Sequence, residues 1–168
     1  MICKLAGCVV LLLAGGYVSV SLTRFEHRRL RVLDGYIALI RYIKGQIDCY
    51  AMPLSDIFSR MDPAILSACL GLEPRVPIPP LSQGGAHPLP DMVQRSRLYL
   101  EPETERLLRD FTGELGTAYR AQQVMRCEHY LLALSEERKK LNDTLPARLR
   151  TGSILSLCCA LGAAVLLW

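Results

Sequence analysis

Three neighbouring residues, Cys127, Glu128 and His129, are the nearest approach to a reactive group in the sequence. Metal ligands and nucleophile–base pairs need side chains that point toward one place. On a helix, residues 127 and 129 point about 200° apart, so they cannot hold one ion together. We therefore interpret Cys127 as a buried core residue and His129 as a surface residue. His27 and His87 have no nucleophile near them in the sequence.

The compact motifs of common enzyme and metal sites are also missing from the sequence. It contains no Gly-rich phosphate loop, Gly-x-Gly-x-x-Gly, Cys-x-x-Cys or His-Glu-x-x-His. We expect no catalytic residue, no cofactor and no metal site. A small membrane-anchored enzyme or sensor stays open as an alternative, since residues distant in sequence can assemble a site in a concave pocket.

The charged residues are confined to the middle of the chain. All 16 acidic residues lie between Glu26 and Asp143, and only Lys4 of the 20 Lys and Arg residues lies outside 24–150. The ends are therefore almost uncharged, which is not the pattern of a plain soluble globule. A formal net charge of +4 is too small to indicate nucleic acid as a partner.

Two apolar tracts occupy the ends that the charges leave free, at 5–22 and 151–168. As a helix each tract would be about 27 Å long, close to the hydrocarbon thickness of a bilayer. We predict transmembrane helices in 1–23 and 151–168 and a helical domain in 24–150 between them. A buried core helix is the alternative for 151–168.

Basic residues next to both tracts predict the orientation in the membrane. They stand on the side of the middle region in both cases, namely Arg24, Arg28, Arg29 and Arg31 at one end and Arg148 and Arg150 at the other. By the positive-inside rule the middle region is cytoplasmic, and its cysteines are free thiols. Arg24, Arg28, Arg29 and Arg31 also suit anionic headgroups, with an acidic protein partner as the alternative. A cleaved leader ending near Ser21, and hence a secreted protein, is a further alternative.

The middle region has the pattern of an all-α bundle. Apolar residues three and four apart run from Leu30 to Ile47, and no breaker separates them from the first tract, so one long helix can form. Short helices are expected after Pro53 and after the capping residue Asp62. Residues 73–90 hold six prolines and are expected to be a loop. Three further helices are expected in 91–100, from Glu101 to about Gly113, and, capped by Thr117, in 118–145, with a hinge or kink at Pro146.

Several short motifs follow one another between the two apolar tracts and into the second of them. After the first tract comes a basic, leucine-bearing helix (Arg28 to Leu33), and then Gln46-Ile47-Asp48-Cys49-Tyr50-Ala51-Met52-Pro53-Leu54. Phe111, Leu115, Gly116 and Gln123 follow at a matching spacing, and Gly152 opens the last apolar run. In this order and spacing the chain resembles the stage III sporulation protein AB family of endospore-forming bacteria. Gln46 and Tyr119 stand where that family has acids.

The resemblance implies a non-enzymatic membrane scaffold in the channel complex between mother cell and forespore. It implies a cytosolic helical bundle similar to the F-type platform domain of type II secretion systems, on the mother-cell side of the outer forespore membrane. The implied partners are other components of the stage III sporulation A complex, including its secretion-type ATPase; a homo-oligomer stays open. The residues we expect to matter for structure or partner binding are Arg28, Arg31, Pro53, Leu54, Leu115, Gly116 and Gln123.

Overall fold

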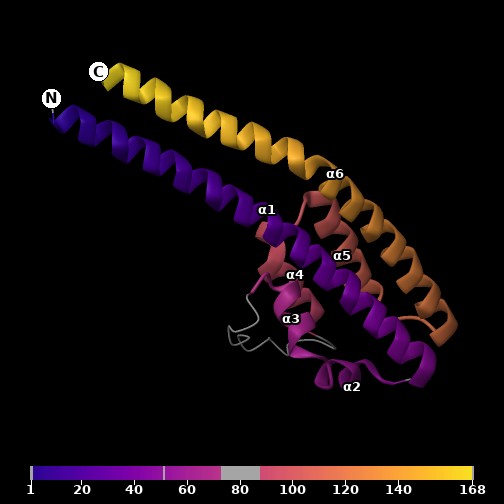
Figure 1. Cartoon of the computed structure of the whole chain (residues 1–168). Coiled ribbons are helices and arrows are strands. Elements are labelled where there is room, and N and C mark those ends of the chain that lie inside the picture. The colour runs from indigo at the N-terminus through magenta and orange to yellow at the C-terminus, as the bar shows by residue number, and fades with distance from the viewer. Residues whose placement is uncertain (1, 51, 73–87, 168) are drawn as a thin grey trace. The chain divides into compact units, whose positions relative to one another are not determined.

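The protein is all-α in the part of the chain described by the computed structural model, residues 2–50, 52–72 and 88–167. Side chains are not described for 2–13 and for most positions from 153 onward. Two long helices, α1 (Ile2–Tyr50) and α6 (Arg120–Leu167), enclose the shorter elements in sequence. These are α2 (Leu54–Ser59), α3 (Pro63–Cys69), α4 (Leu89–Ser96), the 3-10 turn η1 (Arg97–Tyr99) and α5 (Pro102–Glu114) (Figure 1). The predicted fold class is confirmed at this level.

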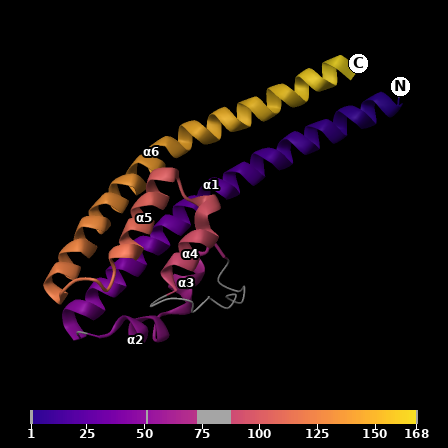
Figure 2. The ribbon, with the colours of Figure 1, turned by 180° about the vertical axis from the view of Figure 1, so that it is seen from behind.

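The chain divides into two units, and both long helices pass through both of them. Residues 28–140 form one unit, and the segments 1–27 and 141–168 form the other. Within each unit α1 and α6 run side by side, as both ribbon views show (Figures 1 and 2). In the 28–140 unit, Asp34 pairs with Arg138 and Lys44 pairs with Glu128. The two helices are antiparallel, because the earlier residue on α1 pairs with the later residue on α6.

The two apolar tracts that we expect to cross a membrane lie in these long helices. Much of 5–22 and of 151–168 falls outside the residues whose side chains are described. Among the described residues, no helix combines the length and apolar character that crossing a membrane requires. The backbone of α1 is continuous from the first tract into the amphipathic segment, which confirms that one long helix forms there.

The core of the 28–140 unit is built around α1. This helix supplies fully buried side chains three and four residues apart, among them Tyr36, Ile40 and Ile43. Every other α-helix of the unit adds at least one fully buried side chain: Ile57, Cys69, Met92, Leu108, Phe111 and Leu134. The spacing on α1 thus acts as predicted, because it places one apolar stripe against all the helices that surround it.

Gly35 has a different role from the one its helix propensity suggests. Glycine inside a helix costs about 1 kcal/mol relative to alanine, but here it lets α1 approach α3 closely. A Cβ atom on Gly35 would lie 2.7 Å from the backbone nitrogen of Cys69 and 2.8 Å from the carbonyl carbon of Ala68. Because these neighbours are backbone atoms of a packed helix, they cannot move aside cheaply.

The local start signals agree with the structure in most places. Asp62 caps α3 with a hydrogen bond from the amide of Ala64 to its carboxylate (2.8 Å). The expected loop over 73–90 lies outside the described residues up to 87, and its last two residues are helical, because α4 begins at Leu89 with a proline in its first turn. Thr117 does not cap α6, which begins only at Arg120; its hydroxyl instead donates to the carbonyl of Glu114 (2.8 Å) and finishes α5.

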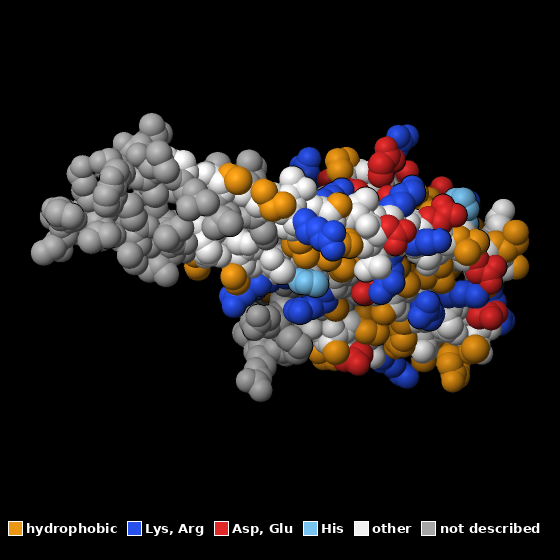
Figure 3. Space-filling view, turned by 45° about the horizontal axis from the view of Figure 1, so that its top comes forward, with side chains coloured by type: hydrophobic (Ala, Val, Ile, Leu, Met, Phe, Trp, Pro, Cys, Tyr) orange, Lys and Arg blue, Asp and Glu red, His pale blue; other side chains and the backbone are white. Residues whose placement is uncertain are grey.

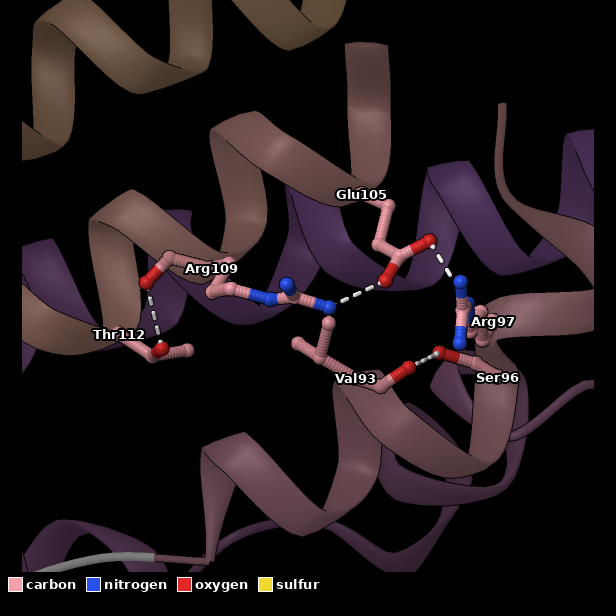
Figure 4. Close-up of polar contacts among 6 residues, drawn as sticks. All are labelled: Val93, Ser96, Arg97, Glu105, Arg109 and Thr112. Atoms are coloured by element: carbon pink, nitrogen blue, oxygen red, sulfur yellow. Dashed lines mark hydrogen bonds and ion pairs between the residues drawn. The ribbon is translucent and has the colours of Figure 1, made fainter. Parts of the chain in front are cut away.

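Polar contacts tie the shorter helices to the core and to one another. The hydroxyls of Tyr36 and Ser96 share a buried hydrogen bond of 2.7 Å between α1 and α4. On the surface, Glu105 accepts from Arg97 (3.2 Å) and from Arg109, so that α5 is linked to η1 (Figure 4). Glu105 and Arg109 stand four residues apart on α5, a spacing that places their side chains next to each other on the helix surface.

Candidate docking site

Pro53 and Leu54 form the entry to α2. Pro53 is extended, with φ −65° and ψ 148°, and its carbonyl accepts the amides of Asp56 (3.1 Å) and Ile57 (3.2 Å). Proline fits this position because it has no amide to lose and its fixed φ suits the residue before a helix. The following turn buries Ile57 completely, while Leu54 is half-buried. Pro53 therefore ends the connection from α1, and Leu54 opens α2 with a half-buried side chain.

Leu115 and Gly116 end α5. The amide of Leu115 donates to the carbonyl of Phe111 (3.0 Å), and its side chain is buried. Gly116 has φ +85°, in the left-handed region that side chains disfavour. This conformation reverses the chain between α5 and α6 within a few residues.

These two motifs, far apart in the sequence, meet in the structure. A Cβ atom on Gly116 would lie 2.9 Å from Cδ1 of Leu54. Leu54 therefore packs over the bare backbone of Gly116, and any larger residue there would push it away. We call Pro53, Leu54, Leu115, Gly116 and Gln123 the turn cluster.

Arg126 closes the turn, a role that the sequence analysis missed. From the second turn of α6 its guanidinium donates to the carbonyl of Glu114 (3.3 Å) and to the hydroxyl of Thr117 (3.2 Å). It also lies 3.7 Å from the Glu114 carboxylate. The carbonyls at the end of a helix lack internal partners, so a cation is favourable there. No local pattern links Arg126 to Glu114, because the chain reverses between them.

Gln123 lies behind the turn. Its backbone N–H donates to the carbonyl of Tyr119 (2.9 Å), and only 8% of the residue is exposed. Its side chain lines a cavity of about 10 Å³ together with Phe111, Glu114, Leu115, Arg126 and Cys127. That volume is at the lower limit for one water molecule. Among the described residues it is the side chain of Arg126, and not that of Gln123, that bridges the turn.

Two exposed tyrosines flank the turn cluster. Tyr50 is 69% exposed at the end of α1, and Tyr119 is 89% exposed just before α6. Arg120 donates to the backbone carbonyl of Asp48, which holds these two helix ends together. Tyrosine gives a large contact area with little loss of side-chain entropy, so exposed tyrosines suit a protein interface. On the face drawn in Figure 3, basic and acidic side chains are intermixed around apolar ones.

Arg28 and Arg31 do not belong to the turn cluster. They lie at the other end of the α1 segment in the 28–140 unit, with Arg28 half-buried and Arg31 exposed. Their neighbour Arg29 pairs with Glu101 (2.9 Å) and donates to the carbonyl of Tyr99 (3.4 Å).

The potentially reactive side chains of Cys127 and His129 are buried and exposed as their helical positions predict. Cys127 is buried and His129 is exposed. Burial raises the pKa of the Cys127 thiol to about 11 and raises that of the Cys69 thiol as well. Both are therefore protonated and poorly nucleophilic near neutral pH. Within the described ranges, no three His, Cys, Asp or Glu side chains could hold a metal ion together.

Comparison with known proteins gives no relative for the chain. No protein family, curated protein or solved structure matches it.

Proposed function

We propose that the protein is a non-enzymatic, membrane-anchored scaffold whose helical unit binds a partner protein beside the turn cluster. The observation that carries this proposal is the contact between Leu54 and Gly116. It joins two of the motifs on which the resemblance to the stage III sporulation protein AB family rests. Both motifs serve packing and chain reversal, which suits a scaffold.

The membrane part of the proposal rests on charge and hydropathy. The tracts 5–22 and 151–168 carry no charge, and arginines stand beside each of them on the side of the middle region. Residues 28–140 would then lie in the cytoplasm, on the mother-cell side of the outer forespore membrane. The tracts lie in α1 and α6, the same helices that frame the core, so anchors and scaffold would be mechanically continuous.

The partner part rests on the surface beside the turn cluster. Tyr50 and Tyr119 are exposed on helix ends that Arg120 fixes to Asp48, so their backbone positions are pre-organised. A secretion-type ATPase, or another component of the stage III sporulation A complex, is the proposed partner. A second copy of the chain would be detected by the same binding experiment.

Binding to the ATPase is tested with the full chain in detergent. Tyr119→Ala and Tyr50→Ala should each weaken ATPase binding about tenfold or more, as truncation of an interface hot spot does. Leu98→Ala is the matched control, because Leu98 is 73% exposed but lies on η1. Equal weakening by all three variants would place the partner elsewhere, and retained binding in both tyrosine variants would refute docking at this surface.

Topology is tested through Cys49, which is exposed, while Cys69 and Cys127 are buried. The cysteines near the two ends of the chain, Cys3, Cys8, Cys158 and Cys159, are replaced by alanine, and intact cells are treated with a membrane-impermeant maleimide. Protection of Cys49 until lysis is expected for a cytoplasmic unit, and Cys49→Ser identifies the labelled residue. Labelling in intact cells would place the unit outside and favour the secreted alternative with a cleaved leader.

A further inference from the structure

A groove between α1 and α6 lies wholly within the unit formed by 1–27 and 141–168. Its volume is about 410 Å³, in the range of sites that bind small molecules. Six residues line it: Leu22, Glu26, Ala147, Arg148, Thr151 and Gly152. The groove is thus separate from the turn cluster and from every contact used above.

Small residues on α6 leave the space. The two helices touch where Leu22 packs on Gly152, since a Cβ atom there would collide with the leucine side chain. Ala147, more than one helical turn earlier on α6, has only a methyl group to offer to the groove. A bulky residue at either position would fill part of this volume.

The groove has one acidic, one basic and one hydroxyl side chain. Glu26 is only 7% exposed, which is uncommon for a carboxylate, whereas Arg148 and Thr151 are exposed. Glu26 and Arg148 each have a polar interaction within the chain. A carboxylate can accept about four hydrogen bonds and a guanidinium can donate about five, so a single partner does not use every position of either group. A ligand that satisfies both must carry a cationic donor and an anionic acceptor.

The position of the groove next to the two apolar tracts suggests where such a ligand comes from. Glu26 follows the apolar tract 5–22 by about one helical turn, and Arg148 precedes 151–168 by slightly less. If these tracts cross the bilayer, as the proposed function holds, the polar residues stand at headgroup level and Leu22 at the start of the acyl chains. This inference therefore rests on the proposed function.

We propose that the groove binds the ethanolamine phosphate headgroup of a membrane phospholipid. The phosphate accepts hydrogen bonds from Arg148 and Thr151, and the primary ammonium group donates to Glu26. A choline headgroup has no N–H to donate to the carboxylate, and a glycerol headgroup has no cation. The groove therefore distinguishes ethanolamine from both.

Native mass spectrometry of the full chain released from detergent tests the proposal. After incubation with equal amounts of phosphatidylethanolamine, phosphatidylcholine and phosphatidylglycerol, we expect the ethanolamine lipid to be retained at least fivefold over each of the others. Glu26→Gln should abolish the preference over the choline lipid, and Arg148→Gln should reduce retention of all three. Arg150→Gln, which changes a nearby arginine outside the groove, should leave retention unchanged. Equal retention of the three lipids by the natural chain would overturn the proposal.

A second variant guards against loss of folding in Glu26→Gln. Ala147→Phe fills the groove from an exposed position, and should lose lipid while keeping the helical circular dichroism signal. Retention unchanged by Ala147→Phe would overturn the site. Displacement of the lipid by equimolar free ethanolamine phosphate would overturn the membrane as its source. Vesicle flotation reports separately on the proposed function, because a chain that does not float refutes anchoring whatever the lipid assay shows.

Discussion

Gly116→Ala should destabilise the 28–140 unit through two separable costs. The first is backbone strain, since a residue with a side chain at φ +85° pays roughly 1–2 kcal/mol. The second is the collision of the new Cβ with Cδ1 of Leu54 at 2.9 Å. That atom ends a flexible side chain, so its displacement adds about 1 kcal/mol. We expect a loss of about 2–3 kcal/mol in the free energy of unfolding, and more for Gly116→Val.

The two costs are separated by a double-mutant cycle with Leu54→Ala. Removing the leucine side chain removes the collision but leaves the strain. Gly116→Ala should therefore cost about 1 kcal/mol less in the Leu54→Ala background than in the natural chain. Gly113→Ala is the control, because Gly113 lies inside α5 with nothing within 4 Å of its added Cβ. This change should stabilise by up to about 1 kcal/mol.

The assay follows the two buried thiols, Cys69 and Cys127, in the full chain in detergent. Their rate of labelling as denaturant rises reports the opening of the unit, and gives the free energy of unfolding for each variant. A value for Gly116→Ala equal to that of Gly113→Ala would refute the structural role of the turn. Equal costs of Gly116→Ala in both Leu54 backgrounds would refute the contact while retaining the strain.

Three further perturbations test other parts of the unit. Gly35→Ala should cost about 2 kcal/mol or more in unfolding free energy, because the added Cβ meets the α3 backbone. Gly45→Ala, whose added Cβ meets nothing within 4 Å, should not lower the unfolding free energy in the same thiol-labelling assay. Ser96→Ala leaves the buried hydroxyl of Tyr36 without its 2.7 Å partner, and should cost about 1–3 kcal/mol by the same measurement. The raised pKa of Cys127 means that the folded state holds its proton more tightly than the unfolded state, whose thiol has a pKa of 9.0. Its stabilising effect is complete below pH 9 and is lost as the pH rises toward about 11, so Cys127→Ala should flatten the pH dependence of unfolding over that window.

Sequence reasoning succeeds where the controlling interaction is local. Asp62 followed by Pro63 predicts the start of α3, because an N-cap acts on an amide two residues away. The spacing on α1 predicts its buried face for the same reason. The contact of Leu54 with Gly116 and the closure of the turn by Arg126 depend on how distant helices come together. Nothing in the local sequence encodes those distances, although a left-handed glycine after a helix could be expected.

Thr117 shows how a local signal can be correct in type and wrong in place. A threonine between two helices can bond to an amide of the helix that follows or to a carbonyl of the helix that precedes. The hydroxyl bonds backward here, to Glu114, and is also an acceptor for Arg126. Arg126 donates to the Thr117 hydroxyl oxygen and to the Glu114 carbonyl, so it favours the hydroxyl in this position. The sequence alone does not contain the approach of Arg126, so it could not decide between the two.

The residue types around the turn cluster bear on the chemistry of the proposed partner. Leu54, Leu115 and Gly116 are occupied with internal packing, so partner contacts must come from their exposed neighbours. At position 119 the resembled family has an acid, and this chain has a tyrosine that is 89% exposed. An acid would pair with a basic partner surface, whereas a tyrosine needs an apolar recess with a polar rim. Tyr119→Phe should therefore keep most of the affinity for the partner, while Tyr119→Asp should lose it. Restored binding by the acid would mean that the partner surface is basic and that Tyr119 is not its anchor.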